Sequence, residues 1–324
     1  MAHHGPGWTG WPIIGALALL AVAGQAATTD QTAAEDVQGG RDLSARLTVP
    51  VTINGGGPYH FVVDTGAERT VISRELADRL VLARAKPVTL LSVTGLDEVE
   101  TAMIPELRLA AGRTRMADVT APLLSENNLG AAGMLGIDSL QAKRVVMDFR
   151  AMRMSISDAP RAAEVQSDEI VVTARRRLGQ LIMVDADADG QKINVIIDTG
   201  SAVSIGNPKL REKLLRRGRL GAVTRIDITS VTGGKAAADY MQVRNVRIGG
   251  VTLKDLPIAF ADPQIFHRLG FENKPAMLLG MDTLQLFDRV SIDFANRNVR
   301  FVLKGSAMEA PLPRLAARAA SGRG

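Results

Sequence analysis

The sequence predicts an all-β protein, mainly strands with a few short helices, built from two pseudo-symmetric lobes. Its apolar residues occur largely in short runs bounded by Gly, Asn and Asp, which is typical of strands and turns. One series of signals also occurs twice along the 324 residues, which indicates a duplicated structural unit. With 46% hydrophobic and 23% charged residues, the chain is folded and long enough for two cores.

Each half begins with a predicted β-hairpin. Residues Leu47–Ile53 run into Asn54-Gly55, and Leu181–Val184 are followed by Asp189-Gly190. Asn-Gly and Asp-Gly favour two-residue turns in which both residues have positive φ. We therefore expect a second strand to return along the first in both halves.

An apolar strand ending in Asp-Thr-Gly follows each hairpin. The two triplets are Asp64-Thr65-Gly66 and Asp198-Thr199-Gly200. A single triplet of this kind is an ordinary turn motif. Two of them, each after an apolar strand and each followed by the same later signals, indicate a functional pair.

Three further signals follow in the same order in both halves. They are a Ser-Val-Thr-Gly segment, an apolar-apolar-Gly segment that leads into a short helix, and a strand that ends in Asp-Phe. Asp138 and Asp282 are expected to be the N-caps of the two short helices. The paired segments are Ser92–Gly95 with Ser230–Gly233, Met134–Gly136 with Leu278–Gly280, and Val145–Phe149 with Val290–Phe294.

The two aspartates predict hydrolytic chemistry. A carboxylate at the end of an apolar strand is costly to bury, so each needs a reason. An approximate two-fold axis between the lobes would place Asp64 beside Asp198, where the two share one proton. The ionised member would then take a proton from water while the protonated member polarises a scissile carbonyl. Hydroxyls that bond across the interface and glycines that allow close approach are expected at Thr65, Gly66, Thr199 and Gly200.

These motifs resemble the retropepsin-like aspartic proteases, especially bacterial exported members with both lobes on one chain. The resemblance covers about residues 44–157 and 176–304 and implies that Asp64 and Asp198 are the catalytic residues of an aspartic-type endopeptidase. It implies that the apolar-apolar-Gly segments support the active-site loops. It also implies that two hairpins close as flaps over bound peptide, with substrate-binding candidates at Thr94, Gly95, Thr232 and Gly233.

Export is predicted from the start of the chain. An apolar run over 11–23 followed by small residues is typical of a signal peptide, although residues 1–10 lack Lys and Arg, which keeps an uncleaved anchor as the alternative. A periplasmic or secreted protein is expected. The predicted segments are a signal peptide (1–26), a linker (27–43), an N-terminal lobe (44–157), a linker (158–175), a C-terminal lobe (176–305) and a basic flexible tail (306–324).

Composition excludes several other classes. The absence of Cys rules out disulfides and thiol nucleophiles. The net charge of +5 is spread along the chain without interleaved aromatics, so nucleic acid is not an expected partner. The segment 185–190 imitates the start of a calcium loop, but Ile196 stands where the closing Glu would be, so no metal or cofactor is expected. A monomer is expected because both half-sites lie on one chain.

Two alternatives remain at this stage. A duplicated β-lobe pair can hold an extended peptide without cutting it. The chain can also be a latent zymogen, in which residues 27–43 or Val171–Arg177 block the cleft. We expect a substrate that is a specific exported or envelope protein or peptide, but the sequence pattern does not identify the residues that line the cleft.

Overall fold

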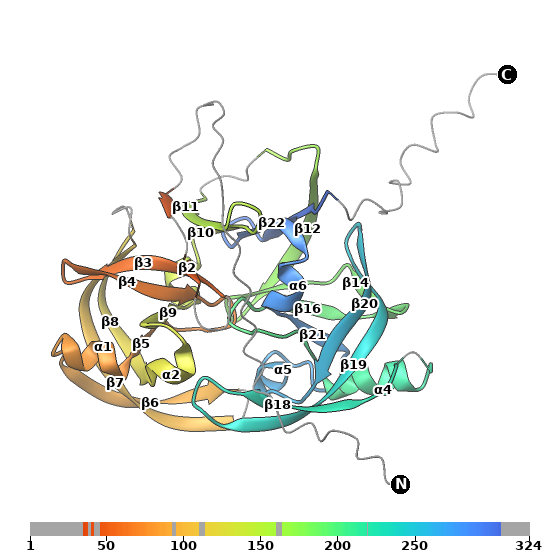
Figure 1. The fold of residues 1–324 in the computed structure, drawn as a ribbon, viewed down its shortest axis with the longest axis horizontal. Helices are drawn as coiled ribbons and strands as arrows, with labels where there is room; N and C mark the ends of the chain where they lie inside the picture. The colour runs from red at the N-terminus through yellow and green to blue at the C-terminus, as the bar shows by residue number, and fades with distance from the viewer. Residues whose placement is uncertain are drawn as a thin grey trace, which may run out of the picture.

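The computed structural model describes residues 35–37, 40–41, 46–92, 95–109, 114–159, 164–218 and 220–305. The predicted signal peptide, the predicted tail and most of the 27–43 linker lie outside the described residues. Strands dominate what is described, and its helices have only four to eight residues, which confirms the all-β prediction (Figure 1). No helix in the described part is long and apolar enough to span a membrane.

The N-terminal lobe, orange to yellow in Figure 1, is a closed ring of strands. The order is β3, β4, β9, β5, β8 and β7, and β7 returns to pair with β3. Two further strands extend it, β2 on β3 and β6 on β7. The elements are β2 (Gly40–Arg41), β3 (Leu47–Ile53), β4 (Gly56–Val63), β5 (Val71–Ser73), α1 (Arg74–Arg79), β6 (Arg84–Ser92), β7 (Gly95–Leu109), β8 (Arg115–Leu124), α2 (Glu126–Leu129), β9 (Gly133–Leu135) and α3 (Ile137–Leu140).

The C-terminal lobe repeats this strand order. It runs β13, β16, β21, β17, β20, β19 and β14, with β18 on β19 and β15 on β14, so that β13 and β14 together occupy the place of β3. The duplication seen in the sequence is thus a duplication of topology. The elements are β13 (Gln180–Met183), β14 (Ala186–Ala188), β15 (Gln191–Lys192), β16 (Asn194–Ile197), β17 (Ile205–Gly206), α4 (Pro208–Leu215), β18 (Thr224–Thr229), β19 (Lys235–Ile248), β20 (Val251–Phe260), α5 (Gln264–Arg268), β21 (Ala276–Leu279) and α6 (Met281–Leu284).

The predicted hairpin turns are confirmed in both lobes. Asn54 and Gly55 have φ of 50° and 79°, and Asp189 and Gly190 have φ of 46° and 79°. Positive φ at both central residues gives the turn the twist that the flanking strands need. The hairpins therefore lead into β4 and into β16, the strands that end at the two Asp-Thr-Gly loops.

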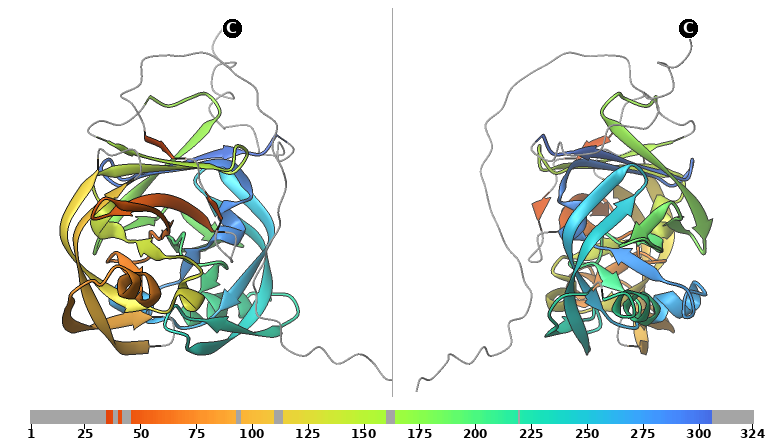
Figure 2. Two further views of the ribbon diagram at one scale, coloured as in Figure 1. Left: turned by 60° about the vertical axis from the view of Figure 1, so that its left-hand side comes forward. Right: turned by 90° about the vertical axis from the view of Figure 1, so that its right-hand side faces the viewer.

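A layer of strands from both lobes closes one end of the molecule, away from the β6–β7 and β18–β19 hairpins (Figures 1 and 2). The two lobes meet where β10 pairs with β22. In order, the layer contains β1 (Glu35–Val37), β11 (Arg153–Asp158), β10 (Lys143–Asp148), β22 (Phe287–Asp293), β23 (Asn298–Leu303) and β12 (Glu169–Arg177).

Strand β12 begins inside the segment predicted as the 158–175 linker. Its first half pairs with β23 and its second half with β13. Val172 and Ala174 are buried while Val171 and Thr173 face outward, so the period-2 alternation of a strand is present here. Because β12 has a partner on both halves, Val171–Arg177 lies in a sheet and not in a cleft.

A buried ion pair holds the lobes together at the β10–β22 junction. Arg144 Nη2 donates to Asp293 Oδ2 at 2.8 Å, and the Asp293 side chain is fully buried. Asn296 donates its backbone and side-chain N–H groups to the same carboxylate. The charge of Asp293 is therefore compensated mainly from the other lobe.

We expect Arg144→Met to lower the free energy of unfolding by about 3–5 kcal/mol, because it leaves the Asp293 carboxylate buried without its cation. Chemical denaturation measures this loss. The matched control is Arg108→Met, which removes an exposed guanidinium paired with Glu106 and should change stability little. Equal losses in the two variants would contradict a structural role for the buried pair.

Candidate active site

The two aspartates are held by the same backbone contacts in both lobes. The Asp64 N–H donates to the Leu135 carbonyl at 2.9 Å, and the Asp198 N–H donates to the Leu279 carbonyl at 3.0 Å. These carbonyls belong to β9 and β21, which lie beside β4 and β16 as the resemblance implied. The apolar-apolar-Gly segments thus fix the backbone positions of the two aspartates.

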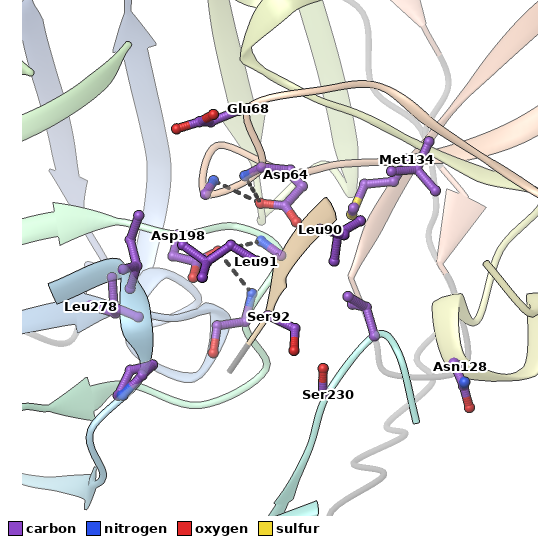
Figure 3. A pocket seen from close by; sticks show the side chains of 18 of the residues that line it. Asp64, Glu68, Leu90, Leu91, Ser92, Asn128, Met134, Asp198, Ser230 and Leu278 are labelled. Carbon is purple, nitrogen blue, oxygen red and sulfur yellow. Dashed lines mark hydrogen bonds between the residues drawn. The ribbon is translucent and has the colours of Figure 1, made fainter. Parts of the chain in front are cut away.

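Each carboxylate is also fixed by its own loop. Asp64 Oδ1 accepts from the N–H groups of Gly66 and Ala67 at 2.7 and 3.0 Å. Asp198 Oδ1 accepts from those of Gly200 and Ser201, both at 3.1 Å, and Figure 3 shows the two carboxyl groups next to each other. One oxygen of each carboxylate is thereby occupied.

The two threonines bond across the lobe interface. The Thr65 hydroxyl donates to the Ile197 carbonyl at 2.8 Å and accepts from the Thr199 N–H at 3.1 Å. Reciprocally, the Thr199 hydroxyl donates to the Val63 carbonyl at 2.7 Å and accepts from the Thr65 N–H at 3.0 Å. This reciprocal set is buried and ties both loops to each other.

The glycines of the triplets let the loops approach. A Cβ added at Gly66 would lie 2.6 Å from Asp198 Oδ1, and one at Gly200 would overlap the Asp64 carboxyl. Any side chain at either position would push the opposite aspartate away. The structure therefore brings together the six predicted residues of the two Asp-Thr-Gly loops.

Burial and mutual repulsion change the acidity of both aspartates. Burial raises the pKa of Asp64, against backbone hydrogen bonds and the Arg46 charge, which lower it. Burial and then the negative charge of Asp64 raise the pKa of Asp198 to about 8. A hydrogen bond between the two carboxyls stabilises the state in which only Asp64 is ionised. The two carboxyls therefore do not readily ionise together, and the pair favours sharing one proton.

A cleft of about 670 Å³ opens over the two aspartates. Its walls include residues 88–92 of β6 and 227–231 of the β18 hairpin, one strand region from each lobe (Figure 3). Of the predicted flap residues, Gly95 starts β7, Thr232 and Gly233 form the turn after β18, and Thr94 lies outside the described residues. A Cβ at Gly233 would lie 2.8 Å from the Asn128 side chain of α2, so this hairpin tip reaches the other lobe.

Apolar clusters flank the aspartates on both sides of the cleft. In the N-terminal lobe, Leu90 and Val231 pack against a buried group that contains Met134. In the C-terminal lobe, Ile228 packs against a buried group that contains Leu278. Because each cluster receives a residue from a hairpin, two apolar surfaces face the space above the carboxyl groups.

Sequence analysis missed two residues that support the loops. The Arg46 side chain donates to the Gly200 carbonyl at 3.2 Å and to the Leu129 carbonyl, while the Gln180 side chain donates to the Gly66 carbonyl at 2.8 Å. Both are buried and line the cleft. Arg46 precedes Asp64 by the same number of residues as Gln180 precedes Asp198, and this equal spacing could have revealed the pair. The match was hidden because one residue is Arg and the other is Gln.

The expected N-cap role of Asp138 and Asp282 is wrong. The helices α3 and α6 are capped by glycines, and neither cap makes a side-chain hydrogen bond. Asp138 instead accepts from the Thr70 N–H and hydroxyl, and Asp282 from those of Ser204. Each carboxylate also accepts from the N–H of the next residue of its own helix, Ser139 at 2.8 Å and Thr283 at 2.6 Å, so it ties the first turn of that helix to the active-site loop without standing at the N-cap position.

We expect Thr65→Val to lower the free energy of unfolding by about 2–4 kcal/mol, because it keeps the side-chain shape but leaves two buried backbone groups unpaired. Thr65→Ser retains the hydroxyl and should cost less. Urea denaturation of both variants distinguishes the hydrogen bonds from the packing. If the valine variant is as stable as the serine variant, the reciprocal bonds contribute nothing.

Comparison with known proteins gives a family that fits this geometry. The family described as "Aspartyl protease" matches residues 49–139 and again residues 184–283, together more than half of the chain. Each match contains one of the two Asp-Thr-Gly loops. No curated protein matches the chain. Two matches to one family, one in each lobe of a duplicated fold, show that this chain belongs to the aspartyl protease family as a two-lobed, retropepsin-like member.

Proposed function

We propose that this protein is an aspartic endopeptidase in which Asp64 and Asp198 activate a water molecule against a peptide bond. The observation that carries the proposal is the pair of buried, interacting carboxyl groups that line one cleft, an arrangement that favours a shared proton. A protein that merely bound peptide would gain nothing from burying two carboxyls together, which costs folding free energy.

The proposed reaction uses the two carboxyl groups in different protonation states. Ionised Asp64 takes a proton from water as the water oxygen attacks the scissile carbonyl carbon, and protonated Asp198 donates a hydrogen bond to the carbonyl oxygen. The tetrahedral intermediate collapses as the C–N bond breaks and a proton passes to the leaving amine. The one-proton state is restored, so no cofactor enters the cycle.

The shape of the cleft favours an extended peptide. The apolar surfaces that contain Met134 and Leu278 lie on opposite sides of the carboxyl pair, so we propose apolar side chains on both sides of the cleaved bond. The hairpins that include Leu90 and Ile228 would cover that peptide. Export through residues 1–26, action on a specific exported or envelope substrate, and a monomeric state are parts of the same proposal.

Asp64→Asn and Asp198→Asn should each lower kcat/KM at least about a thousandfold, because either change removes one of the two proton-transfer groups. The assay incubates the mature chain with an unstructured protein and maps cuts by mass spectrometry. Asp168→Asn, an exposed position outside the cleft, is the matched control. Cleavage that survives either active-site change would refute the paired mechanism.

A folded wild-type chain that binds peptide but cuts nothing would favour the non-catalytic binding module. Cleavage that appears only after loss of an N-terminal fragment would favour the latent enzyme. The segment Val171–Arg177 is not a blocking candidate because it forms β12.

The pH dependence of kcat/KM should be bell-shaped, because only the one-proton form of the pair is active. As pH rises through about 8, Asp198 loses its proton and activity falls. As pH decreases through the pKa of Asp64, that base becomes protonated and activity falls again. Initial rates on a peptide without ionisable groups measure the profile. A single sigmoid that remains flat to pH 10 would contradict the shared proton.

A further inference from the structure

One buried acceptor in the cleft has no partner. The Gln180 side chain is 1% exposed and its Nε2 donates to the Gly66 carbonyl, but its Oε1 makes no hydrogen bond within the described structure. A buried, unpaired amide oxygen costs free energy unless a donor reaches it. Because Gln180 lines the cleft, a bound peptide can supply that donor as a backbone N–H.

The cleft is charged at the end where Gln180 lies. After Asp-Thr-Gly the N-terminal loop continues with Ala67-Glu68-Arg69, whereas the C-terminal loop continues with Ser201-Ala202-Val203. The symmetry-related positions are therefore charged at one end and apolar at the other. Glu68 and Asn128 lie on opposite sides of the pocket (Figure 3).

One cation at this end of the main cleft has no ion-pair partner among the described residues. Glu68 accepts from Arg268 of α5 at 2.8 Å, which forms an ion pair between the lobes. Arg69 is exposed and has no hydrogen bond or ion pair with any residue that the structure describes. Glu68, Arg69 and Arg268 line both the main cleft and a second groove of about 540 Å³, so they stand where the two join. Asp118 and Asp138 line only the second groove, so the unpaired cation is offered to a ligand from the side of the main cleft.

We propose that this end of the cleft is a subsite for an acidic side chain of the substrate, with the substrate carboxylate paired to Arg69 and a neighbouring peptide N–H donated to Gln180. The inference rests on the proposed function, because it takes the cleft as the peptide site. Arg69 supplies a charge without a partner and Gln180 an acceptor without a donor, and an Asp or Glu residue in a peptide provides both missing groups. The pseudo-symmetric end has Ala202 and Val203 in place of Glu68 and Arg69. Its cation, Arg46, is buried and donates to the Gly200 and Leu129 carbonyls, so the preference belongs to one side of the cleaved bond.

Neighbouring charges predict opposite effects for two substitutions. Arg69→Gln removes the free cation, whereas Glu68→Gln removes an anion and frees Arg268. The first should therefore abolish the preference for an acidic residue and the second should strengthen it. Arg79→Gln, at the exposed end of α1 and away from both grooves, is the matched control for the general attraction of a basic protein.

The test begins with cleavage of a peptide library by the wild-type chain. We expect Asp and Glu to be enriched at one position on one side of the cut. The best substrate is then made with Glu or Gln at that position, and the Glu peptide should have a kcat/KM about three- to fivefold higher at low salt. This ratio should fall to about one in Arg69→Gln, rise in Glu68→Gln and stay unchanged in Arg79→Gln. Gln180→Met should weaken both peptides alike, because its contact is with the backbone.

Binding separates failure of this subsite from failure of the proposed function. The uncut library is captured on immobilised Asp198→Asn protein, with and without Arg69→Gln. Selection of acidic peptides that disappears with Arg69→Gln supports the subsite even if no cleavage is seen, in which case only hydrolysis is refuted. Cleavage without an acidic preference, or a preference that persists in Arg69→Gln, overturns the subsite and leaves the endopeptidase intact. If Gln180→Met binds the peptides with the affinity of the wild-type chain, Gln180 is not part of the subsite.

Discussion

The contact between two buried carboxyl groups constrains the whole molecule. Burial raises the free energy of the ionised form of both Asp64 and Asp198, and the charge of Asp64 raises that of Asp198 further. The backbone N–H groups of the loops, the reciprocal threonine bonds and the shared proton offset that cost. Each of these interactions requires the two lobes to be correctly placed relative to each other. The duplicated topology and the interlobe layer therefore position the atoms of the two carboxyl groups.

The lobes also depend on each other above the carboxyl pair. Val231 of the C-terminal hairpin packs with an apolar cluster of the N-terminal lobe, and the turn at Gly233 meets Asn128. On the other side, β6 lies against α5. Each hairpin rests on the opposite lobe, so the width of the cleft depends on the interlobe arrangement that the β10–β22 pairing and Arg144 maintain.

Local and repeated features were predictable from the sequence, and three-dimensional ones were not. Asn54-Gly55 dictates its own turn, and a repeat with two Asp-Thr-Gly triplets allows few arrangements other than a two-fold pair. Strand β12 was missed because its short alternation follows a polar segment and its partners are far away in sequence. The roles of Arg46 and Gln180 depend on which carbonyl each reaches across the interface, which spacing alone does not reveal.

The same two residues show why a symmetric pair of aspartates need not behave symmetrically. Arg46 and Gln180 occupy equivalent positions and each bonds the opposite loop, but only Arg46 carries a charge. That charge lowers the pKa of Asp64, whereas no cation acts comparably on Asp198. The proton is therefore favoured on Asp198, and under the proposed mechanism Asp64 is the base for the attacking water. Both loops thus receive a side-chain hydrogen bond at this position, but only the donor Arg46 is charged. This difference gives two chemically identical carboxyls different roles.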